Sequence, residues 1–350
     1  MQPSSKDKEI ILDHWVFNIR DHTFHDVVSK YYESDTFPDV VEWEIDGKSL
    51  QLTRNPDHSH TLFANGEPVL TERDGQVVEL IIRQSGVIPD NGPFLRYNHA
   101  LESLKMPNIK IIGDDFLPDD PALKELYAPK LRQVGSNFLA DCKELGVVDL
   151  PELRVVGDSF MENNVFCHTF TTPKLIKIGD FFLNQNKFLR TLDLPNLREV
   201  GTDCLCKNQI LRELKAPKLR FVDECFLESN LELTGLDLPA LRFVGTSFLW
   251  RNIKLEQLNV PNLSYVGDDF LAHNLCLTTL SCPNLRRVEN NFLSSNQKLI
   301  HLEVPKLKPK NIGEDFIKKL IRKIPMDINQ FQQLCQNIGH SQPVQSQAQR

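Results

Sequence analysis

The stretch LDLPNLREVGTDCLCKNQILREL, residues 192–214, decides the fold of this chain. Its proline recurs on both sides at an unvarying interval of 22 residues, at Pro107, Pro129, Pro151, Pro173, Pro195, Pro217, Pro239, Pro261, Pro283 and Pro305. A unit this short cannot bury its own apolar side chains, so the period predicts a solenoid in which stacked copies cover one another. We call each unit a coil and number its positions from the proline, which is position 0.

The end of each coil predicts a parallel sheet. A typical coil reads P-x-L-x-x-V-G-x-x-F-L-x-x-N-x-x-L-x-x-L-x-L. Its last leucines alternate with period two, which is typical of a strand whose alternate residues point inward. Stacked strands lie about 4.8 Å apart, so ten coils would span roughly 45 Å. The proline is expected to end the strand, because it cannot donate a ladder hydrogen bond.

Three further columns predict the corners of the coil. The glycine at position 6, as in Gly113, Gly135 and Gly157, suits a turn with positive φ. The Asp, Ser or Thr at position 7 is a good N-cap for a short helical turn that carries the Phe-Leu pair. The asparagine at position 13 is expected to satisfy backbone groups at the next corner, since a buried amide must be hydrogen-bonded.

Other patterns flank the repeats. Residues 23–32 read as a short helix, and from residue 40 an antiparallel meander is expected, with turns at Asp46-Gly47, Asn65-Gly66 and Asp74-Gly75. After Pro305 the register slips by two residues, and residues 314–323 predict an amphipathic helix that closes the last coil. We therefore expect an α+β cap or small domain at 1–91, about ten coils at 92–313, a helical cap at 314–340 and a disordered tail at 341–350.

Composition narrows the classes of function. The net charge of −7 is uneven, because residues 1–92 hold 8 Lys/Arg against 17 Asp/Glu, a net −9, which leaves +2 for the rest. Without a basic footprint we expect no nucleic-acid partner. No apolar stretch reaches membrane-spanning length and residues 1–20 lack an export-signal pattern, so we expect no membrane insertion. Eight scattered cysteines are typical of reduced buried thiols, which favours a cytoplasmic protein or one delivered to a host cell without a cleaved signal peptide.

The columns resemble the leucine-rich repeats, and in particular the BspA-like class, whose units share Leu-Pro, Leu-x-x-Ile-Gly and Phe-containing segments. The resemblance covers about residues 92–320. Here the unit is one residue shorter, Phe-Leu replaces Ala-Phe, and Asn stands where the class often has the cysteine that Cys142 keeps. It implies a curved solenoid with a sheet on one face and short helical turns or extended segments on the other. It also implies binding, without specifying a ligand.

Positions 18 and 20 flank the inward residue of the strand and vary from coil to coil. A mixed, acid-leaning row of this kind is typical of a protein-binding face, which repeat arrays generally use for partners, and equally of any solvated sheet face. The partner-binding candidates on it are Tyr127, Asp149, Thr191, Asp193, Lys215, Asp237, Gln257 and Asn259.

Position 3 forms a basic ladder, with Lys110, Arg132, Arg154, Arg198, Arg220, Arg242, Arg286 and Lys308. The ladder predicts either a groove for phosphate or an acidic partner, or pairing with the acid-rich column at position 7. We favour pairing, because like charges one coil apart repel.

Position 4 carries Phe221, Phe243 and Tyr265 in successive coils, beside Arg220 and Arg242. This composition is typical of an interaction hot spot, although stacked rings can also simply brace a solenoid. A second apolar row after the asparagine column is expected to pack at the corner, or to mark an interface if exposed: Val165, Phe166, Phe188, Ile210, Leu231, Ile253 and Leu275, with Trp250 nearby.

Signals for chemistry are weak. Cys204, Cys206 and Cys225 could bring thiols together across coils, but no second matching pair exists, so we expect no metal site. The histidines, including His58 and His60, fall in different columns or in one loop, and no glycine-rich phosphate loop occurs. We therefore expect no catalytic residue and no cofactor.

The sequence predicts a noncatalytic repeat solenoid that binds a protein partner, with its oligomeric state open. Arrays of this resemblance also occur among bacterial effectors delivered into host cells, which makes an effector role one expectation. The alternative is an enzyme whose catalysis lies in residues 1–92 while the repeats select the substrate. A third possibility, a structural surface protein, would need an export route.

Overall fold

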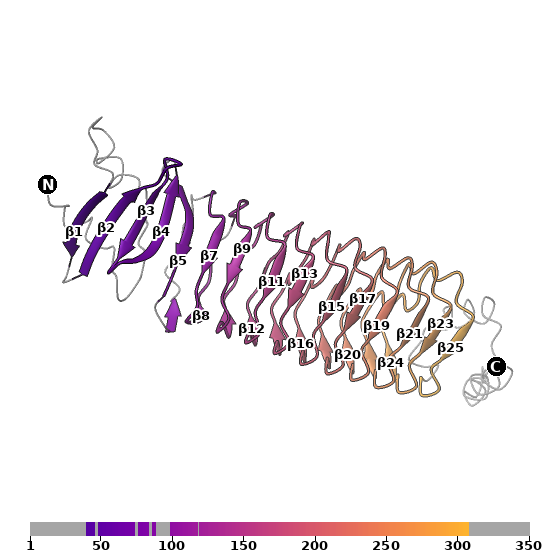
Figure 1. The fold of residues 1–350 in the computed structure, drawn as a ribbon. Coiled ribbons are helices and arrows are strands. Elements are labelled where there is room, and N and C mark those ends of the chain that lie inside the picture. The colour runs from indigo at the N-terminus through magenta and orange to yellow at the C-terminus, as the bar shows by residue number, and fades with distance from the viewer. Residues whose placement is uncertain are drawn as a thin grey trace, which may run out of the picture.

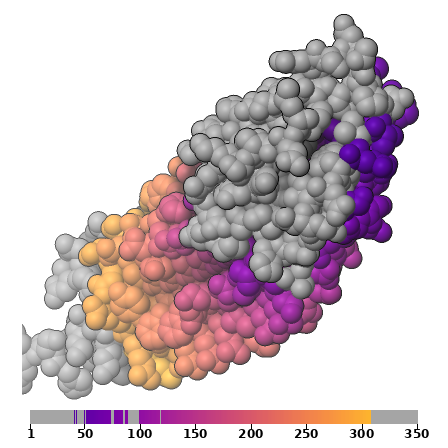
Figure 2. All heavy atoms as spheres, turned by 90° about the vertical axis from the view of Figure 1, so that its left-hand side faces the viewer, coloured from indigo at the N-terminus to yellow at the C-terminus, as the bar shows by residue number. Residues whose placement is uncertain are grey.

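The computed structural model describes residues 40–45, 48–73, 76–83, 86–88, 99–117 and 119–307. Its coils stack in sequence order along one axis into an elongated solenoid of about ten turns (Figure 1). The space-filling view shows the same order on the surface, where the colours pass from indigo to yellow along the body (Figure 2). The predicted repeat solenoid is confirmed.

The region before the first coil is the predicted antiparallel meander. Each strand pairs with the next, and Asn65 and Gly66 have the positive φ values of 50° and 79° that the turn between two of them requires. The strands are β1 (Val40–Ile45), β2 (Lys48–Arg54), β3 (His60–Ala64), β4 (Glu67–Arg73) and β5 (Gln76–Ile81). Strand β5 then pairs in parallel with the first coil, so the meander and the solenoid share one sheet.

The predicted strand at positions 18–20 forms one long face, which we call the strand face. Its middle residue is inward in almost every coil, as in β15 and β17. Neighbouring strands pair in parallel, as β15 does with β17, but the pairing is interrupted between β9 and β11, between β13 and β15 and between β19 and β21. The strands are β7 (Ser103–Lys105), β9 (Glu125–Tyr127), β11 (Val147–Asp149), β13 (Thr169–Thr171), β15 (Thr191–Asp193), β17 (Glu213–Lys215), β19 (Gly235–Asp237), β21 (Gln257–Asn259), β23 (Thr279–Ser281) and β25 (His301–Glu303).

A second parallel sheet, which we did not predict, runs along positions 4 and 5; we call it the ladder face. Position 5 is a buried, β-branched Val or Ile in each coil from Pro107 to Pro283, and such residues suit a pleated, half-buried surface. The strands are β6 (Gly86–Ile88), β8 (Ile109–Ile112), β10 (Gln133–Val134), β12 (Val155–Val156), β14 (Lys177–Ile178), β16 (Glu199–Val200), β18 (Phe221–Val222), β20 (Phe243–Val244), β22 (Tyr265–Val266) and β24 (Arg287–Val288).

Positions 7 to 12 form a turn segment without helix. The resemblance implied short helical turns or extended segments here, and the described residues instead form successive non-helical turns. The predicted helical N-caps at position 7 are therefore wrong. Positions 8, 10 and 12 are left-handed, as in Phe181, Leu183 and Gln185 with φ of 57°, 48° and 61°. Their N–H groups bond to neighbouring coils, as from Phe181 to the Thr202 carbonyl at 2.9 Å, so inter-coil hydrogen bonds replace those of a helix.

The role predicted for the position 6 glycine is also wrong. Among the described glycines only Gly66 and Gly86 have positive φ. A Cβ on Gly157 would instead lie 2.6 Å from the backbone carbon of Gly135 and the nitrogen of Ser136 in the preceding coil. Glycine suits this position at Gly157 because the two coils approach too closely there for a side chain, whereas Asp223 and Glu289 hold the same position in two other coils.

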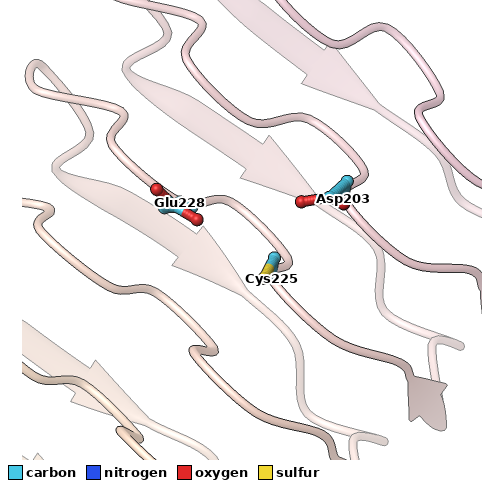
Figure 3. Close-up of side chains that lie close together, drawn as sticks. All are labelled: Asp203, Cys225 and Glu228. Atoms are coloured by element: carbon cyan, nitrogen blue, oxygen red, sulfur yellow. The ribbon is translucent and has the colours of Figure 1, made fainter.

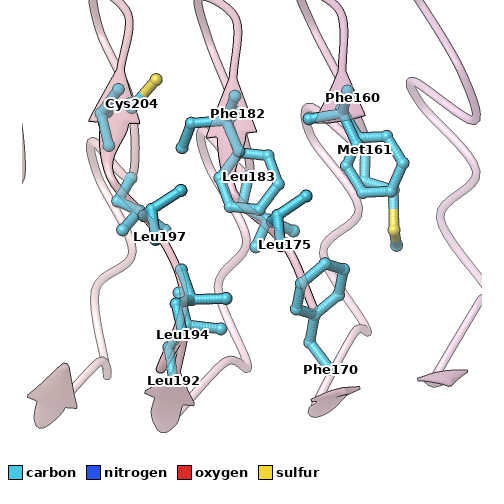
Figure 4. Close-up of a cluster of buried hydrophobic side chains, with 14 of the residues drawn as sticks. Phe160, Met161, Phe170, Leu175, Phe182, Leu183, Leu192, Leu194, Leu197 and Cys204 are labelled. Carbon is cyan, nitrogen blue, oxygen red and sulfur yellow. The ribbon is translucent and has the colours of Figure 1, made fainter. Parts of the chain in front are cut away.

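The core is made of columns that run along the axis. Phe160 and Phe182 stack at position 9 with ring centroids 5.6 Å apart, and Cys204 takes the place of the ring in the next coil (Figure 4). Phe170 packs edge-on against both phenylalanines. Each core side chain is thus covered by the coils before and after it, as the repeat predicted.

Some expectations lie outside the described residues. These are the helix at 23–32, the start of the array near residue 92, the helical cap at 314–323 and the tail at 341–350. In the described part of the chain, nothing has the helical length and hydrophobicity that a membrane crossing demands.

Candidate functional site

The eight strand-face candidates lie where the sequence placed them. All eight side chains are exposed: Tyr127, Asp149, Thr191, Asp193, Lys215, Asp237, Gln257 and Asn259. In-register pairing sets Thr191 beside Glu213 and Asp193 beside Lys215, so in these two coils each acid lies beside a residue that is not acidic. The candidates extend from β9 to β21, roughly 29 Å at about 4.8 Å per coil, and form a long polar surface that contains no compact cluster.

The aromatic ladder, Phe221, Phe243 and Tyr265, does form a cluster on the ladder face. The rings of Phe221 and Phe243 stack with centroids 5.5 Å apart and an interplanar angle of 7°, and both side chains are nearly half exposed, at 46% and 43%. Tyr265 follows at 6.3 Å with a tilt of 38°. The stacking covers the ring faces and leaves ring edges toward solvent, so the ladder both braces the coils and presents apolar surface.

Polar contacts fix the last ring of the aromatic ladder. The Tyr265 hydroxyl donates to Glu289 Oε1 at 3.3 Å, and Arg287 lies over the Tyr265 ring, 5.6 Å from its centroid. Arg287 also pairs with the same carboxylate at 2.7 Å. Burial is the main cause that raises the pKa of the Tyr265 hydroxyl, and the negative charge of Glu289 is the second. This corner is therefore held in place by an Arg–Glu–Tyr network, whereas Phe221 and Phe243 are held by stacking.

Basic residues flank the aromatic ladder on one side. Arg198, Arg220 and Arg242 at position 3 are all exposed, and backbone bonds of 3.0 Å link their coils in register. The sequence favoured pairing between the basic residues at position 3 and the acids at position 7, but the structure gives these acids other partners. Carboxylates of Asp114, Asp158, Asp180 and Asp268 instead accept the backbone N–H of position 7 in the following coil, at 2.6 to 2.8 Å.

The second apolar row lies at the corner and is partly exposed. Phe166 and Phe188 stack at 5.5 Å and 7° and are 47% and 48% exposed. Leu231 and Leu275 are exposed too, while Val165, Ile210, Ile253 and Trp250 are half-buried. The row is therefore partly packed at the corner and partly exposed, and its Phe166–Phe188 pair repeats the ring geometry of the aromatic ladder.

The cysteines do not form the thiol cluster considered from sequence. Cys204 and Cys206 lie in the core, where burial raises their pKa, and their thiols donate to the carbonyl oxygens of Gly179 and Cys225. Cys225 instead approaches two carboxylates, Asp203 and Glu228, with one ligand atom from each of the three residues within 4.8 Å of the others (Figure 3).

This trio is the group of side chains that could hold a cation in the described part of the chain. Burial, then the carboxylates, raises the pKa of the Cys225 thiol to about 11, so the thiol is protonated at neutral pH. Two carboxylates and a neutral thiol make a weak ligand set. Sequence analysis missed Asp203 and Glu228, because their approach depends on how two coils stack.

A polar cleft of about 350 Å³ lies where the meander joins the first coils. Its charges pair with one another: Arg73 with Asp57 at 3.1 Å, Lys105 with Glu79 at 2.7 Å, and Lys124 with Glu102 at 3.1 Å. The repeat pattern could not reveal this cleft, since it joins two differently built regions. Its paired charges favour a structural role.

The histidines of the N-terminal loop are separated by the fold. His60 is buried beside Glu72, with Nδ1 and Oε1 2.8 Å apart, whereas exposed His58 contacts Arg54 at 3.0 Å. His22 and His25 lie outside the described residues. In the part of the N-terminal region that the structure describes, these two histidines do not share a site.

Comparison with known proteins identifies the repeats. The family model for the BspA type leucine rich repeat region matches residues 110–234 and 219–337, with 6 copies. A leucine-rich repeat protein from Bacteroides ovatus is 14% identical over 76% of this chain and 77% of its own, with a TM-score of 0.47. A leucine rich cell surface protein from Faecalibacterium prausnitzii is 13% identical over 86% of this chain and 98% of its own, with a TM-score of 0.30.

The pneumococcal vaccine antigen PcpA is 13% identical over 82% of this chain and 97% of its own, with a TM-score of 0.25. No curated protein sequence matches the chain significantly. The family matches span well over half of the 350 residues and include the described coils from residue 110 to residue 307. The chain belongs to the BspA-type leucine-rich repeat family.

Proposed function

We propose that this protein is a noncatalytic interaction scaffold that binds a protein partner through the aromatic ladder on its ladder face. One observation carries the proposal: Phe221 and Phe243 stack in adjacent coils with almost half of each side chain exposed. Aromatic residues among arginines dominate the energetics of many protein interfaces. Repeat solenoids also generally serve as extended binding surfaces.

The strand face is the competing surface, and a pull-down in full-length protein separates the two. We expect Phe221→Ala/Phe243→Ala to lose the partner and Thr191→Arg/Asp237→Arg, on exposed positions of the strand face, to retain it. The opposite pattern would assign binding to the strand face. Retention by both double variants would contradict both assignments.

Full-length protein is needed because the N-terminal region is not detachable. β5 and β7 pair over three residues, from Glu79 with Ser103 to Ile81 with Lys105. A truncation at residue 93 would expose that edge of the sheet, and an exposed edge promotes aggregation. Surface variants in the intact chain avoid this effect.

We also propose a reducing compartment, either the cytoplasm of the producing cell or a host cell into which the protein is delivered as an effector. The support is that seven cysteines in the described residues are free thiols, five of them buried. Cell fractionation with alkylation of thiols in intact cells tests this proposal. Recovery of the protein outside the cell with oxidised cysteines would contradict it.

A further inference from the structure

The surroundings of the aromatic ladder differ on its two sides. On one side, position 3 supplies the exposed Arg220 and Arg242, one per coil. On the other side, position 6 supplies Asp223 in one coil and Gly245 in the next. A Cβ on Gly245 would lie only 2.9 Å from the backbone of Asp223 in the preceding coil. The aromatic ladder therefore has arginines on one flank. Its other flank carries the carboxylate of Asp223 and no side chain at Gly245.

The chemistry of this surface favours an acidic ligand with apolar side chains. Exposed ring edges carry the positive part of the aromatic quadrupole, so they add to the attraction that the arginines exert on carboxylates. The exposed acids Asp223 and Glu224 would repel a second acidic row, so the ligand's carboxylates belong on the arginine side. Apolar side chains would lie over Phe221 and Phe243.

The spacing of the ladder restricts the conformation of the ligand. The Phe221 and Phe243 centroids are 5.5 Å apart, and the strands beneath them lie about 4.8 Å apart. An α-helix returns to the same face every turn, with a pitch of about 5.4 Å. An extended peptide repeats a face every two residues, about 6.8 Å, and so falls out of step with the coils. A helix lying along the solenoid axis thus places one apolar residue per turn over each coil.

We infer that the aromatic ladder binds an acidic amphipathic α-helix of the partner, with apolar residues at i, i+3 or i+4, and i+7 over Phe221 and Phe243 and its carboxylates facing Arg220 and Arg242. This inference rests on the proposed function and names the kind of segment that the scaffold recognises. It differs from strand addition, since β18, β20 and β22, which carry the aromatic ladder, are each paired on both sides and offer side chains to a ligand.

Four synthetic 18-residue peptides test the inference by fluorescence anisotropy with the full-length chain. The first has leucines on one helical face and glutamates elsewhere, and the second has the same composition with leucine and glutamate alternating. The third is the first with lysine for glutamate, and the fourth is polyglutamate without leucine. We expect the first to bind at least tenfold more tightly than the other three.

Two double variants give matched readouts. Phe221→Ala/Phe243→Ala should weaken binding of the first peptide at least tenfold, whereas Phe166→Ala/Phe188→Ala should leave it unchanged. The second pair is an apt control, because its rings have the same 5.5 Å and 7° geometry and similar exposure. Val165 and Lys187 precede Phe166 and Phe188, whereas arginines precede both Phe221 and Phe243.

Charge reversal supplies a gain of binding. Arg220→Glu/Arg242→Glu should weaken the acidic helix and strengthen the lysine helix, each by tenfold or more. Failure of the acidic helix to bind, equal binding by the alternating peptide, or equal binding by polyglutamate would overturn the inference. Suppose that the peptides give one of these results while Phe221→Ala/Phe243→Ala still loses the native partner in the pull-down. The inference of a helical ligand then fails, and the proposed binding through the aromatic ladder stands. If the native partner is retained, the proposed function fails.

Discussion

Asn208 and Asn230 are joined across adjacent coils, since the backbone N–H of Asn208 donates to Asn230 Oδ1 at 3.0 Å. Asn208 in turn accepts the N–H of Asn186 at 2.6 Å, and its Nδ2 donates to the Leu183 carbonyl at 3.0 Å. The asparagine column was predicted to satisfy backbone groups at the corner, and this prediction is confirmed. Each amide is fully buried, so water cannot replace it.

Asn208→Ala should strongly destabilise the solenoid. It leaves the buried N–H of Asn186 and carbonyl of Leu183 without their partner, at about 1–3 kcal/mol each. Urea unfolding measures the loss. Asn262→Ala is the control, because Asn262 donates to the Pro239 carbonyl at 2.7 Å from an exposed position, where water can substitute. Equal losses in the two variants would contradict the role of burial.

Gly157→Ala should destabilise the protein although Gly157 has no left-handed backbone. The added Cβ would lie 2.6 Å from the backbone of the preceding coil, and such overpacking typically costs about 1–3 kcal/mol. Gly235→Ala serves as the control, because its Cβ would meet the flexible Glu213 side chain at 3.1 Å. Thermal unfolding of both variants tests this prediction. An unchanged unfolding midpoint for Gly157→Ala would contradict destabilisation by the added Cβ.

Phe181→Asn should stabilise the protein by about 1 kcal/mol. A left-handed conformation costs a non-glycine residue roughly 1–2 kcal/mol, and asparagine tolerates it better than a bulky residue. Phe181 has φ of 57° at position 8 and is partly exposed, whereas Asn137 holds the same position with φ of 58°. The reverse change, Asn137→Phe, should destabilise by a similar amount. Opposite signs in the unfolding midpoints are the expected result.

Phe248→Ala should cost about 3–5 kcal/mol, because the ring is fully buried and its removal leaves a cavity. It stacks between Phe226 and Phe270, at 5.9 and 5.6 Å. Phe243→Ala removes an exposed ring and should cost about 1 kcal/mol or less. Denaturant titration of both tests the contrast. It also shows whether the variants used for binding remain folded.

Stability should fall as the pH rises above about 9. Burial raises the pKa of the Cys167 thiol from 9.0 to about 12, so the folded protein keeps this proton at a pH where the unfolded chain has released it. Between these values the free energy of unfolding loses about 1.4 kcal/mol per pH unit for this thiol. Cys167→Ala should flatten the slope of stability between pH 9 and 10.5 by that amount. An unchanged slope would contradict the shift.

Much of the fold could be predicted because its determinants are local or periodic. The leucines at positions 16, 19 and 21, the buried asparagines and the meander around Asn65-Gly66 were all read from spacing, and the described residues confirm them. The position 6 glycine and the position 7 acids were placed in the right columns but given the wrong reason. These residues are explained by contacts between adjacent coils, which the sequence of a single coil does not show.

The candidate site was likewise predicted in part from the sequence and completed by the structure. The sequence placed Phe221, Phe243 and Tyr265 in one column, but a column can be buried or exposed, and only the structure shows exposed ring edges on a second sheet. The approach of Asp203, Cys225 and Glu228 likewise appears only in three dimensions.

By itself, the sequence determined that this protein is a stack of coils, because a 22-residue period leaves each apolar face to be covered by its neighbours. Tertiary structure decided the handedness of the backbone at positions 8, 10 and 12, the close approach of coils at glycines such as Gly157, and the exposure of the aromatic ladder. These features follow from distances between adjacent coils, which depend on the packing of all columns at once.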